Sequence, residues 1–206
     1  MKKLTINLFS LINKFKEKFT PFRKKRKLEQ VNIIIGKFQP FTIGHLNCIK
    51  NVYNNTGLKT VILVIDGKVD EKHPFNKDLM TKMIKSIILH YEKYCADFIF
   101  VKNADIVKNI ELLREKGYEP ISWVCGTDRY NRYNEMIIKY GFKINLSPNF
   151  KVFCINRYND NINATSVRES LKMGLKSVYI SYTPQCIHYL YSDLKNALNN
   201  FYNLQV

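Results

Sequence analysis

The chain has 206 residues, of which 46% are hydrophobic, and it contains 13 phenylalanines and 13 tyrosines. This length and apolar content suffice for one well-buried core and exclude an intrinsically disordered protein. The net charge of +16 at neutral pH is uneven, because residues 1–28 carry +9 of it. The rest of the chain is only moderately basic, which suits an anionic small molecule such as a nucleotide and does not require nucleic acid as a partner.

The cysteines are scattered along the chain without a Cys-x-x-Cys pair. They are Cys48, Cys95, Cys125, Cys154 and Cys186. This spacing fits neither a zinc site nor a disulfide framework, so we predict no metal site. Because most of them lie in apolar stretches, we expect buried thiols in a reducing compartment, and therefore a cytoplasmic protein.

Residues 1–28, here called the leader, differ from everything after them. Large apolar side chains recur there at spacings of three and four and define one face of an amphipathic helix, which Pro21 would end before a basic cluster at 23–27. The apolar run is too short to span a membrane, and Asn7 interrupts what would be a signal-peptide core. Three interpretations stay open: a helix that covers the domain, a docking segment for a larger assembly, and a membrane-surface or targeting segment.

From Val31 onward, short apolar strands alternate with amphipathic helical stretches. We predict strands at 31–35, 60–66, 97–102, 121–125 and 150–156, and helices near 43–55, 76–94, 105–116, 129–140, 166–173 and 184–200. Alternating units of this kind predict an α/β fold, a Rossmann-like, doubly wound five-stranded parallel sheet with the leader as an N-terminal extension. The domain would span 29–206 and bind ligands beyond the carboxyl ends of its strands.

The most informative segment reads Gly-Lys-Phe-Gln-Pro-Phe-Thr-Ile-Gly-His at 36–45, directly after the first predicted strand. Strand, glycine turn and helix start in this order are typical of a phosphate site, because unpaired N–H groups and the positive end of the helix dipole meet there. Thr42 suits the N-cap, and His45 then lies in the first turn on the same side. Gly44 leaves no side chain where a phosphate must approach the backbone. The alternative is an ordinary turn with a locally packed histidine.

A second segment, Ile-Asn-Ala-Thr-Ser-Val-Arg-Glu at 162–169, follows the last predicted strand. Ser166 and Glu169 fit a capping box, with Thr165 as the alternative cap. Either cap places Arg168 in the first helical turn, where a guanidinium is unfavourable unless an anion lies in front of it. The alternative is a solvated arginine paired with a carboxylate.

A third segment, Val-Cys-Gly-Thr-Asp-Arg-Tyr at 124–130, again runs from strand through glycine to a helix start. Asp128 would cap this helix or hold a ribose hydroxyl. Arg129 would meet an acidic group on an acceptor. A cap alone also explains Asp128.

These segments resemble motifs of the nucleotidylyltransferase superfamily. Residues 36–45 resemble its Gly-Arg-Phe-Gln-Pro-Phe-His-x-Gly-His signature, above all that of nicotinamide-nucleotide adenylyltransferases, and 162–168 resemble its Ile-Ser-(Ser/Gly/Ala)-Thr-x-(Ile/Val)-Arg motif. His-Pro-Phe at 73–75, followed by Met83 and Ile84, is similar to its Asn-Pro-Phe…Met-Ile segment. Gly-Thr-Asp-Arg at 126–129 looks like its Gly-Ser-Asp turn, with the arginine of phage-encoded, cytidylyltransferase-like forms. The resemblance covers roughly 31–190, in the order of the family.

The resemblance implies transfer of a nucleotidyl group from ATP or CTP to a phosphate or a phosphorylated alcohol, with release of pyrophosphate and with Mg²⁺ held largely by the phosphates. It implies that His45, Thr42 and Lys37 bind the triphosphate and stabilise charge as the α–β bond breaks, while Arg168 holds the β and γ phosphates. The further residues implied at the nucleotide are Gly36, Phe38, Gly44, Gly126, Asp128, Thr165 and Ser166. Those implied at the acceptor are Asp66, Trp123 and Arg129.

Several positions depart from the family pattern. Thr42 replaces the first histidine, although its hydroxyl can still donate to a phosphate, and Lys37 replaces an arginine, which keeps the charge and loses the planar fork. His73 and Asn163 replace an asparagine and a serine, and Met80 stands where an arginine is expected. With these departures the chemistry stays feasible and the acceptor open, and a protein of reduced activity or a purely structural one remains an alternative.

The leading prediction is AMP transfer from ATP to nicotinamide mononucleotide or a similar phosphorylated acceptor. The alternative within the enzymes is cytidylyl transfer to a phosphorylated alcohol. The alternative outside them is a catalytically reduced nucleotide-fold protein that the leader recruits to an assembly such as a virion. The expected partners are small nucleotides, with a protein assembly or membrane surface at the leader and a homo-oligomer left open.

Overall fold

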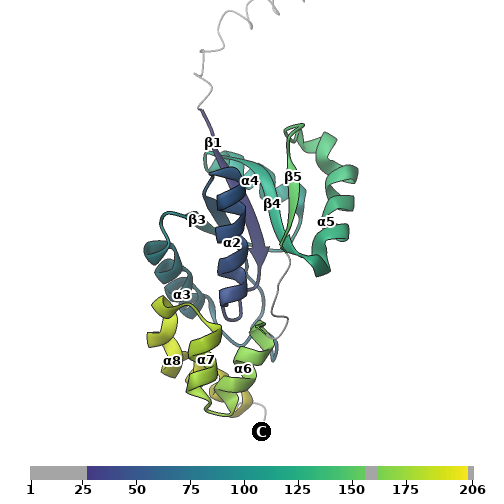
Figure 1. Cartoon of the computed structure of the whole chain (residues 1–206). Coiled ribbons are helices and arrows are strands. Elements are labelled where there is room, and N and C mark those ends of the chain that lie inside the picture. The colour runs from purple at the N-terminus through teal and green to yellow at the C-terminus, as the bar shows by residue number, and fades with distance from the viewer. Residues whose placement is uncertain (1–26, 156–161, 204–206) are drawn as a thin grey trace, which may run out of the picture.

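A computed structural model of the chain describes residues 27–155 and 162–203 (Figure 1). Almost the whole leader, residues 1–26, lies outside the described residues, so its predicted helix stays a prediction. The five strands are β1 (Glu29–Gly36), β2 (Thr60–Ile65), β3 (Cys95–Val101), β4 (Tyr118–Gly126) and β5 (Lys151–Ile155). Each lies within a few residues of its predicted position.

The strands form one parallel sheet in the order β3-β2-β1-β4-β5. The predicted doubly wound, five-stranded sheet is therefore confirmed. The chain builds outward from β1 to β3 on one side and then returns to add β4 and β5 on the other side. In a sheet of this kind the reversal point, between β1 and β4, opens a crevice at the carboxyl ends of the strands.

Helices follow the strands in alternation. They are α2 (Ile43–Thr56), α3 (Lys77–His90), α4 (Ile106–Glu115), α5 (Thr127–Tyr140), α6 (Ala164–Lys172), α7 (Lys176–Tyr182) and α8 (Tyr191–Asn203), with short 3₁₀ helices at Gly141–Ile144 and Gln185–Leu190. None of these helices, in the part of the chain that the structure describes, is long and apolar enough to cross a membrane.

Two helical predictions at the C-terminal end need correction. The helix predicted at 184–200 is a 3₁₀ turn followed by α8, and α7 was not predicted at all. The break lies at Thr183, because the proline that follows it disfavours helical backbone at the preceding residue. Tertiary packing stabilises α7, whose Tyr179 is fully buried and donates a hydrogen bond of 2.6 Å to the carbonyl of Ile187.

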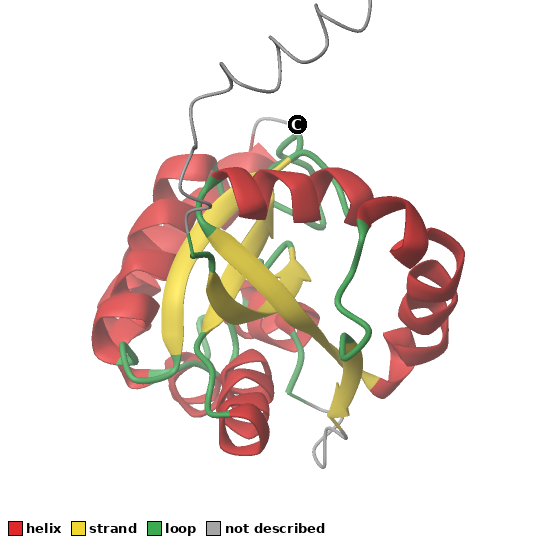
Figure 2. Cartoon of the chain, turned by 90° about the horizontal axis from the view of Figure 1, so that it is seen from above, coloured by secondary structure: helices red, strands yellow, loops and turns green. Residues whose placement is uncertain are grey.

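The sheet separates two hydrophobic layers, and Figure 2 shows helices on both of its sides. Alternate side chains of a strand point to opposite faces, so in β2 Ile62 packs with α2 and α3, and Leu63 packs with α4. The C-terminal helices extend the first of these layers and lie below the sheet beside α3 (Figure 1). Their position brings α6 to the edge of the sheet where the strands end.

The cysteine prediction is confirmed for three of the five residues, since Cys48, Cys95 and Cys125 are buried. Cys154 is exposed on the edge strand β5, and Cys186 is partly buried. Burial raises the pKa of Cys95 to about 12 and that of Cys186 to about 11. Both thiols are therefore protonated at neutral pH and poor nucleophiles.

Candidate functional site

A cavity of about 440 Å³ opens where β1 and β4 end. Its wall is built from the loop after β1, the first turn of α2 and the start of α5. Of the predicted site residues, those that line it are Gly36, Lys37, Phe38, His45, Gly126, Asp128 and Arg129. The structure therefore brings the first and third predicted segments together at the reversal point of the sheet.

The loop between β1 and α2 is folded around one aromatic side chain. Phe38 is buried, has a φ of 50°, and packs its ring edge-on against the ring of His45 at a centroid distance of 5.0 Å. A Cβ on Gly36 would lie only 3.2 Å from the Phe38 ring, which explains the glycine at this position. The loop thus presses Phe38 against His45 at the cavity wall.

Thr42 and His45 form a reciprocal capping box at the start of α2, as predicted for the cap. The Thr42 hydroxyl accepts a hydrogen bond of 3.4 Å from the His45 N–H, and the Thr42 N–H donates to His45 Nδ1 at 3.0 Å. Because Nδ1 accepts from the backbone, the ring hydrogen of a neutral His45 resides on Nε2. The sequence alone had not indicated this tautomer. His45 is thereby held as a hydrogen-bond donor at the cavity.

The structure gives Thr42 a different place from the predicted contact with phosphate. Its side chain is 1% exposed, and its hydroxyl lies 3.0 Å from His45 Nδ1 as well as capping the helix. Thr42 therefore orients the His45 ring through its contacts with Nδ1. Gly44 is close to the second predicted segment, since a Cβ there would be 3.4 Å from the carbonyl oxygen of Ile162.

The predicted caps of α6 are wrong. Asn163 is the N-cap, and its side-chain oxygen accepts hydrogen bonds from the Ser166 N–H at 2.9 Å and from the Ser166 hydroxyl at 3.3 Å. The helix consequently begins at Ala164, earlier than predicted, and Arg168 lies in its second turn. Thr165 and Ser166 remain in the first turn, near the cavity wall at Ala164.

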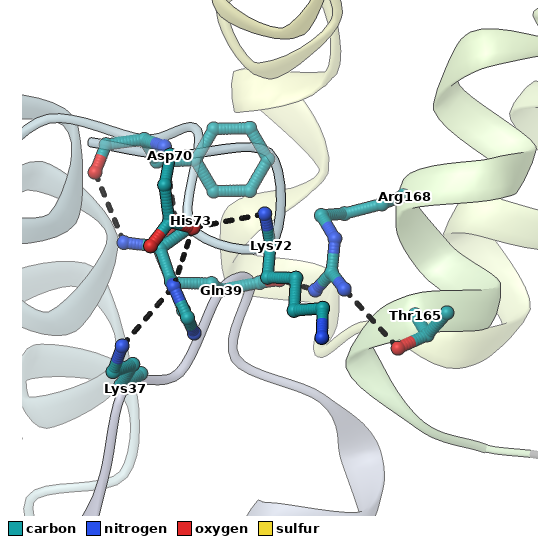
Figure 3. A network of polar contacts seen from close by, with 8 residues as sticks. Lys37, Gln39, Asp70, Lys72, His73, Thr165 and Arg168 are labelled. Atoms are coloured by element: carbon teal, nitrogen blue, oxygen red, sulfur yellow. Dashed lines mark hydrogen bonds and ion pairs between the residues drawn. The ribbon is translucent and has the colours of Figure 1, made fainter.

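Arg168 reaches from α6 to the loop after β1 (Figure 3). Its guanidinium donates to the carbonyl of Gln39 at 2.6 Å and to the Thr165 hydroxyl at 3.1 Å. Burial lowers the pKa of Arg168, although Glu169, Tyr202 and Asp70 oppose the shift. A cation that is desolvated and bound to neutral acceptors is ready to take an anion in front of it.

The loop between β2 and α3 closes over the same region. The buried Gln39 amide accepts from the Phe75 N–H at 2.9 Å and donates to the Phe75 carbonyl at 3.0 Å. Asn76 then caps α3 by accepting from the Leu79 N–H at 3.0 Å. Gln39 therefore fixes the segment that carries His73, which lines the cavity and was not among the predicted site residues.

We expect Gln39→Met to destabilise the protein, because it leaves the Phe75 N–H and carbonyl buried without their partner. The expected loss in free energy of unfolding is about 1–3 kcal/mol for each group left without a hydrogen-bond partner. Chemical denaturation measures it against Gln185→Met, a change of the same kind at an exposed glutamine. Equal free energies of unfolding for the two variants would contradict this role of Gln39.

Two residues predicted at the acceptor, Trp123 and Asp66, are not among the residues that line the cavity, and Asp128, which does line it, is not a helix cap. Trp123 is 1% exposed and stacks on Tyr133 at 3.9 Å, so it belongs to the core, whereas Tyr133 lines the cavity. Asp66 pairs with Lys77 at 2.7 Å at the end of β2. Asp128 does not cap α5, because the N-cap is Gly126 and Asp128 is the second residue of the helix. Its carboxylate lies 3.2 Å from Arg129.

A parallel sheet with its cavity at the reversal point, lined by a helix start, defines an α/β protein of the nucleotide-binding class. Residues 33–170 match the cytidylyltransferase-like family. The chain therefore belongs to this family, in agreement with the resemblance to nucleotidylyltransferases. No curated protein matches the chain significantly in sequence.

Solved structures share the fold at low sequence identity. A bifunctional NMN adenylyltransferase/ADP ribose pyrophosphatase from Francisella tularensis, complexed with AMP and a Mn ion, is 17% identical with a TM-score of 0.58. The match covers 86% of this chain and 53% of that one, so this chain corresponds to about half of that protein. A Plasmodium falciparum nicotinic acid mononucleotide adenylyltransferase complexed with APC is 15% identical, with a TM-score of 0.54 and coverage of 84% and 98%.

Proposed function

We propose that the protein transfers AMP from ATP to a phosphorylated acceptor, nicotinamide mononucleotide in the first place, and releases pyrophosphate. The observation that carries the proposal is the position of His45. Its capping box fixes an Nε2–H donor at the N-terminus of α2, inside a cavity that Lys37 also lines. The likeness to adenylyltransferases supports the fold of this site, and the family supports nucleotidyl transfer.

In this proposal the triphosphate lies across the N-terminus of α2. An oxygen of the acceptor phosphate attacks the α-phosphorus, and the bond from the α-phosphorus to the α–β bridging oxygen breaks. The electron pair leaves with pyrophosphate. His45 Nε2–H and the Lys37 ammonium stabilise the charge that develops on the phosphate oxygens, and Arg168 holds the β and γ phosphates. Such transfer needs positioning and electrostatic stabilisation rather than a covalent intermediate.

Mg²⁺ fits the proposal as an ion that the triphosphate brings with it. Mg²⁺ prefers phosphate oxygens and waters with one or two carboxylates, and Asp128 presents one carboxylate at the cavity wall. Bound there, the ion would neutralise phosphate charge. Among the described residues, no three side chains of histidine, cysteine, aspartate or glutamate gather as a ready metal site.

The acceptor would lie toward the start of α5. Arg129 lines the cavity beside Asp128, and both side chains are exposed, so the pair can open to an incoming phosphate. Two alternatives have their own support. The family name favours cytidylyl transfer to a phosphorylated alcohol. Met80 is 3% exposed in the core, where the family pattern expects an arginine, and this favours a catalytically reduced protein recruited through the leader.

Pyrophosphate release tests the proposal directly. ATP, CTP, GTP and UTP are each incubated with Mg²⁺ and with nicotinamide mononucleotide, nicotinate mononucleotide or a phosphorylated alcohol. We expect release with ATP and a mononucleotide acceptor. Release with CTP and a phosphorylated alcohol would favour the cytidylyl alternative. Binding of a nucleotide without release in any combination would favour the recruited, non-catalytic protein.

The leader gives a separate prediction. Deletion of residues 1–28 is expected to leave the sheet domain folded and able to bind ATP, because β1 begins at Glu29. The large apolar side chains of the leader cost about 1.5–3 kcal/mol each when left in water, so we expect them to pack on a partner. The deletion should therefore abolish association with an assembly or a membrane. Circular dichroism, ATP binding and co-sedimentation measure these properties. An insoluble or markedly destabilised product would instead make the leader part of the core.

A further inference from the structure

Two large apolar side chains are exposed at the end of α5. Phe142 is 94% exposed, and Ile138 is 78% exposed. The helical path continues from α5 into the 3₁₀ helix, because the Gly141 N–H donates to the Ile137 carbonyl. Residues four apart on such a path share a face, so Phe142 and Ile138 project from the same side. The solvent side of a surface helix is normally polar, whereas the side of α5 that carries Tyr133 packs in the core.

Lysines surround this apolar tip. We call residues 138–151 the Phe142 corner, and this segment contains no acidic residue. Its exposed lysines are Lys139, Lys143 and Lys151. The ammonium groups of the first two lie 5.2 and 5.8 Å from the centre of the Tyr140 ring. The nearest acidic residue in the sequence is Glu135. An exposed apolar tip with a positive rim is complementary to an anionic surface.

A contact with α4 holds the Phe142 corner in place. Arg114 of α4 is paired with Glu119 at 2.7 Å, and its guanidinium also donates to the carbonyl of Asn145 at 3.0 Å. Ile144 fills the core beneath the corner and is buried. The backbone that carries Phe142 is therefore fixed on both sides, and the fold presents the ring to solvent.

The Phe142 corner lies at the same edge of the sheet as the leader. All five strands are parallel, so they begin at one edge and end at the other, where the cavity opens. The order β1-β4-β5 separates the starts of β1 and β5 by two strand spacings, about 10 Å. The register aligns Asn32, Ser122 and Lys151, so β5 begins three residues further along than β1. Figure 1 shows the connection from α5 to β5 at the end of the molecule where the chain enters β1.

We propose that the leader and the Phe142 corner bind together to a membrane surface that contains anionic lipids. The sequence predicts an amphipathic helix in the leader, and residues 1–28 carry a charge of +9. The apolar side chains of the two segments insert among the lipid headgroups, while their lysines meet the lipid phosphates. Each segment alone binds weakly, and both engage one surface because they share an edge of the sheet. The nucleotide cavity, at the opposite edge, stays open to water.

A membrane fits this surface better than a folded protein partner does. A stable interface between proteins buries about 800 Å² on each partner, and two side chains supply about half of that at most. A bilayer needs no matching shape, because single protruding side chains enter its headgroup layer. Lysine suits the same place, since its alkyl chain lies along apolar neighbours while its ammonium reaches the phosphates. None of this depends on the reaction that the cavity catalyses.

Co-sedimentation of the full-length protein with vesicles tests the proposal. The vesicles contain phosphatidylcholine alone or an equimolar mixture of phosphatidylcholine and phosphatidylserine. We expect binding to the anionic vesicles only, and weaker binding as the salt concentration rises. Phe142→Gln should lower the partition coefficient about tenfold, because it removes the larger apolar side chain of the tip. Thermal unfolding should match that of the wild type, since the Phe142 ring is in contact with solvent.

Matched variants separate the Phe142 corner from the rest of the surface. Met173→Gln removes another exposed apolar side chain, at the end of α6, and should leave binding unchanged. Lys143→Gln should weaken binding about fivefold. Lys102→Gln, at an exposed lysine just after β3 on the cavity edge, should have a much smaller effect. Binding by Phe142→Gln that equals binding by the wild type would overturn the proposal, because the leader would then be the whole contact.

Fluorescence reports on insertion directly, because the chain has a single tryptophan, Trp123, and it is buried. In Phe142→Trp, anionic vesicles should shift the emission of the added indole to shorter wavelength, and brominated lipids should quench it. In Met173→Trp, the added indole lies with α6 at the other end of the molecule (Figure 1) and should not respond. Quenching in both variants, or in neither, would contradict the proposed orientation.

Other occupants of the Phe142 corner would give different results. A wild type that does not bind vesicles and sediments as a dimer, with Phe142→Gln a monomer, would assign the corner to a second copy of the chain. Binding to polyglutamate as tight as binding to anionic vesicles would assign it to an acidic protein. Equal binding to both kinds of vesicle would exclude recognition of anionic lipid. Each of these results overturns the proposal.

Discussion

Replacement of His45 by alanine is expected to slow nucleotidyl transfer by about 10²–10³-fold, which is the usual cost of removing one donor that stabilises charge in a transition state. The capping box supplies the physical reason. Because Thr42 donates to His45 Nδ1, the ring presents a fixed Nε2–H and needs no reorientation when the α–β bond breaks. The loss should therefore appear mainly in kcat.

For His45→Ala, an effect on turnover must be distinguished from a loss of stability. His45→Ala leaves the Thr42 N–H without its ring acceptor, which costs about 1–3 kcal/mol, but the hydrophobic layers on both sides of the sheet remain. Pyrophosphate release is measured beside the free energy of unfolding, with His90→Ala as the control at an exposed site. Turnover like that of the wild type in folded His45→Ala would exclude His45 from the reaction.

The parts of the site that were predictable from sequence are local ones. The order of strand, glycine and helix start predicted where the crevice lies. Apolar runs such as β2 indicate buried strands, and the three-residue spacing of Thr42 and His45 indicates the first turn of a helix. The same local reasoning failed at α6. Asn163, Thr165 and Ser166 are all residue types that favour the N-cap, so their identities do not decide between them, and the structure uses Asn163.

The parts that were not predictable depend on contacts between distant segments. Gln39 and Lys37 each bond a residue 36 positions away, Phe75 and His73, and no spacing in the sequence reports such pairs. Trp123 shows the related error within one strand. Neighbouring residues of a strand face opposite sides, and Trp123 packs in the layer of Tyr133 while Val124 packs in the layer of α2.

Arg168→Met is expected to lower kcat/KM for the triphosphate by about 10²–10³-fold, because Arg168 is proposed to hold the β and γ phosphates. The side chain is not expected to be essential for folding. Burial lowers the pKa of Arg168, which means that the folded protein holds the charged form less favourably than the unfolded chain does. Since arginine is charged in both states near neutral pH, this penalty is present throughout that range. Methionine has no such penalty.

We therefore expect ligand-free Arg168→Met to be about as stable as the wild type. Tripolyphosphate should no longer raise its unfolding temperature. The penalty removed offsets the two hydrogen bonds lost, those to the Gln39 carbonyl and the Thr165 hydroxyl. Thermal unfolding with and without tripolyphosphate and Mg²⁺ measures both properties, and Arg132→Met, at an exposed position on α5, is the matched control. Arg168→Lys should recover part of the response, because it keeps the charge without the planar fork. An undiminished thermal shift in Arg168→Met would show that the β and γ phosphates bind elsewhere.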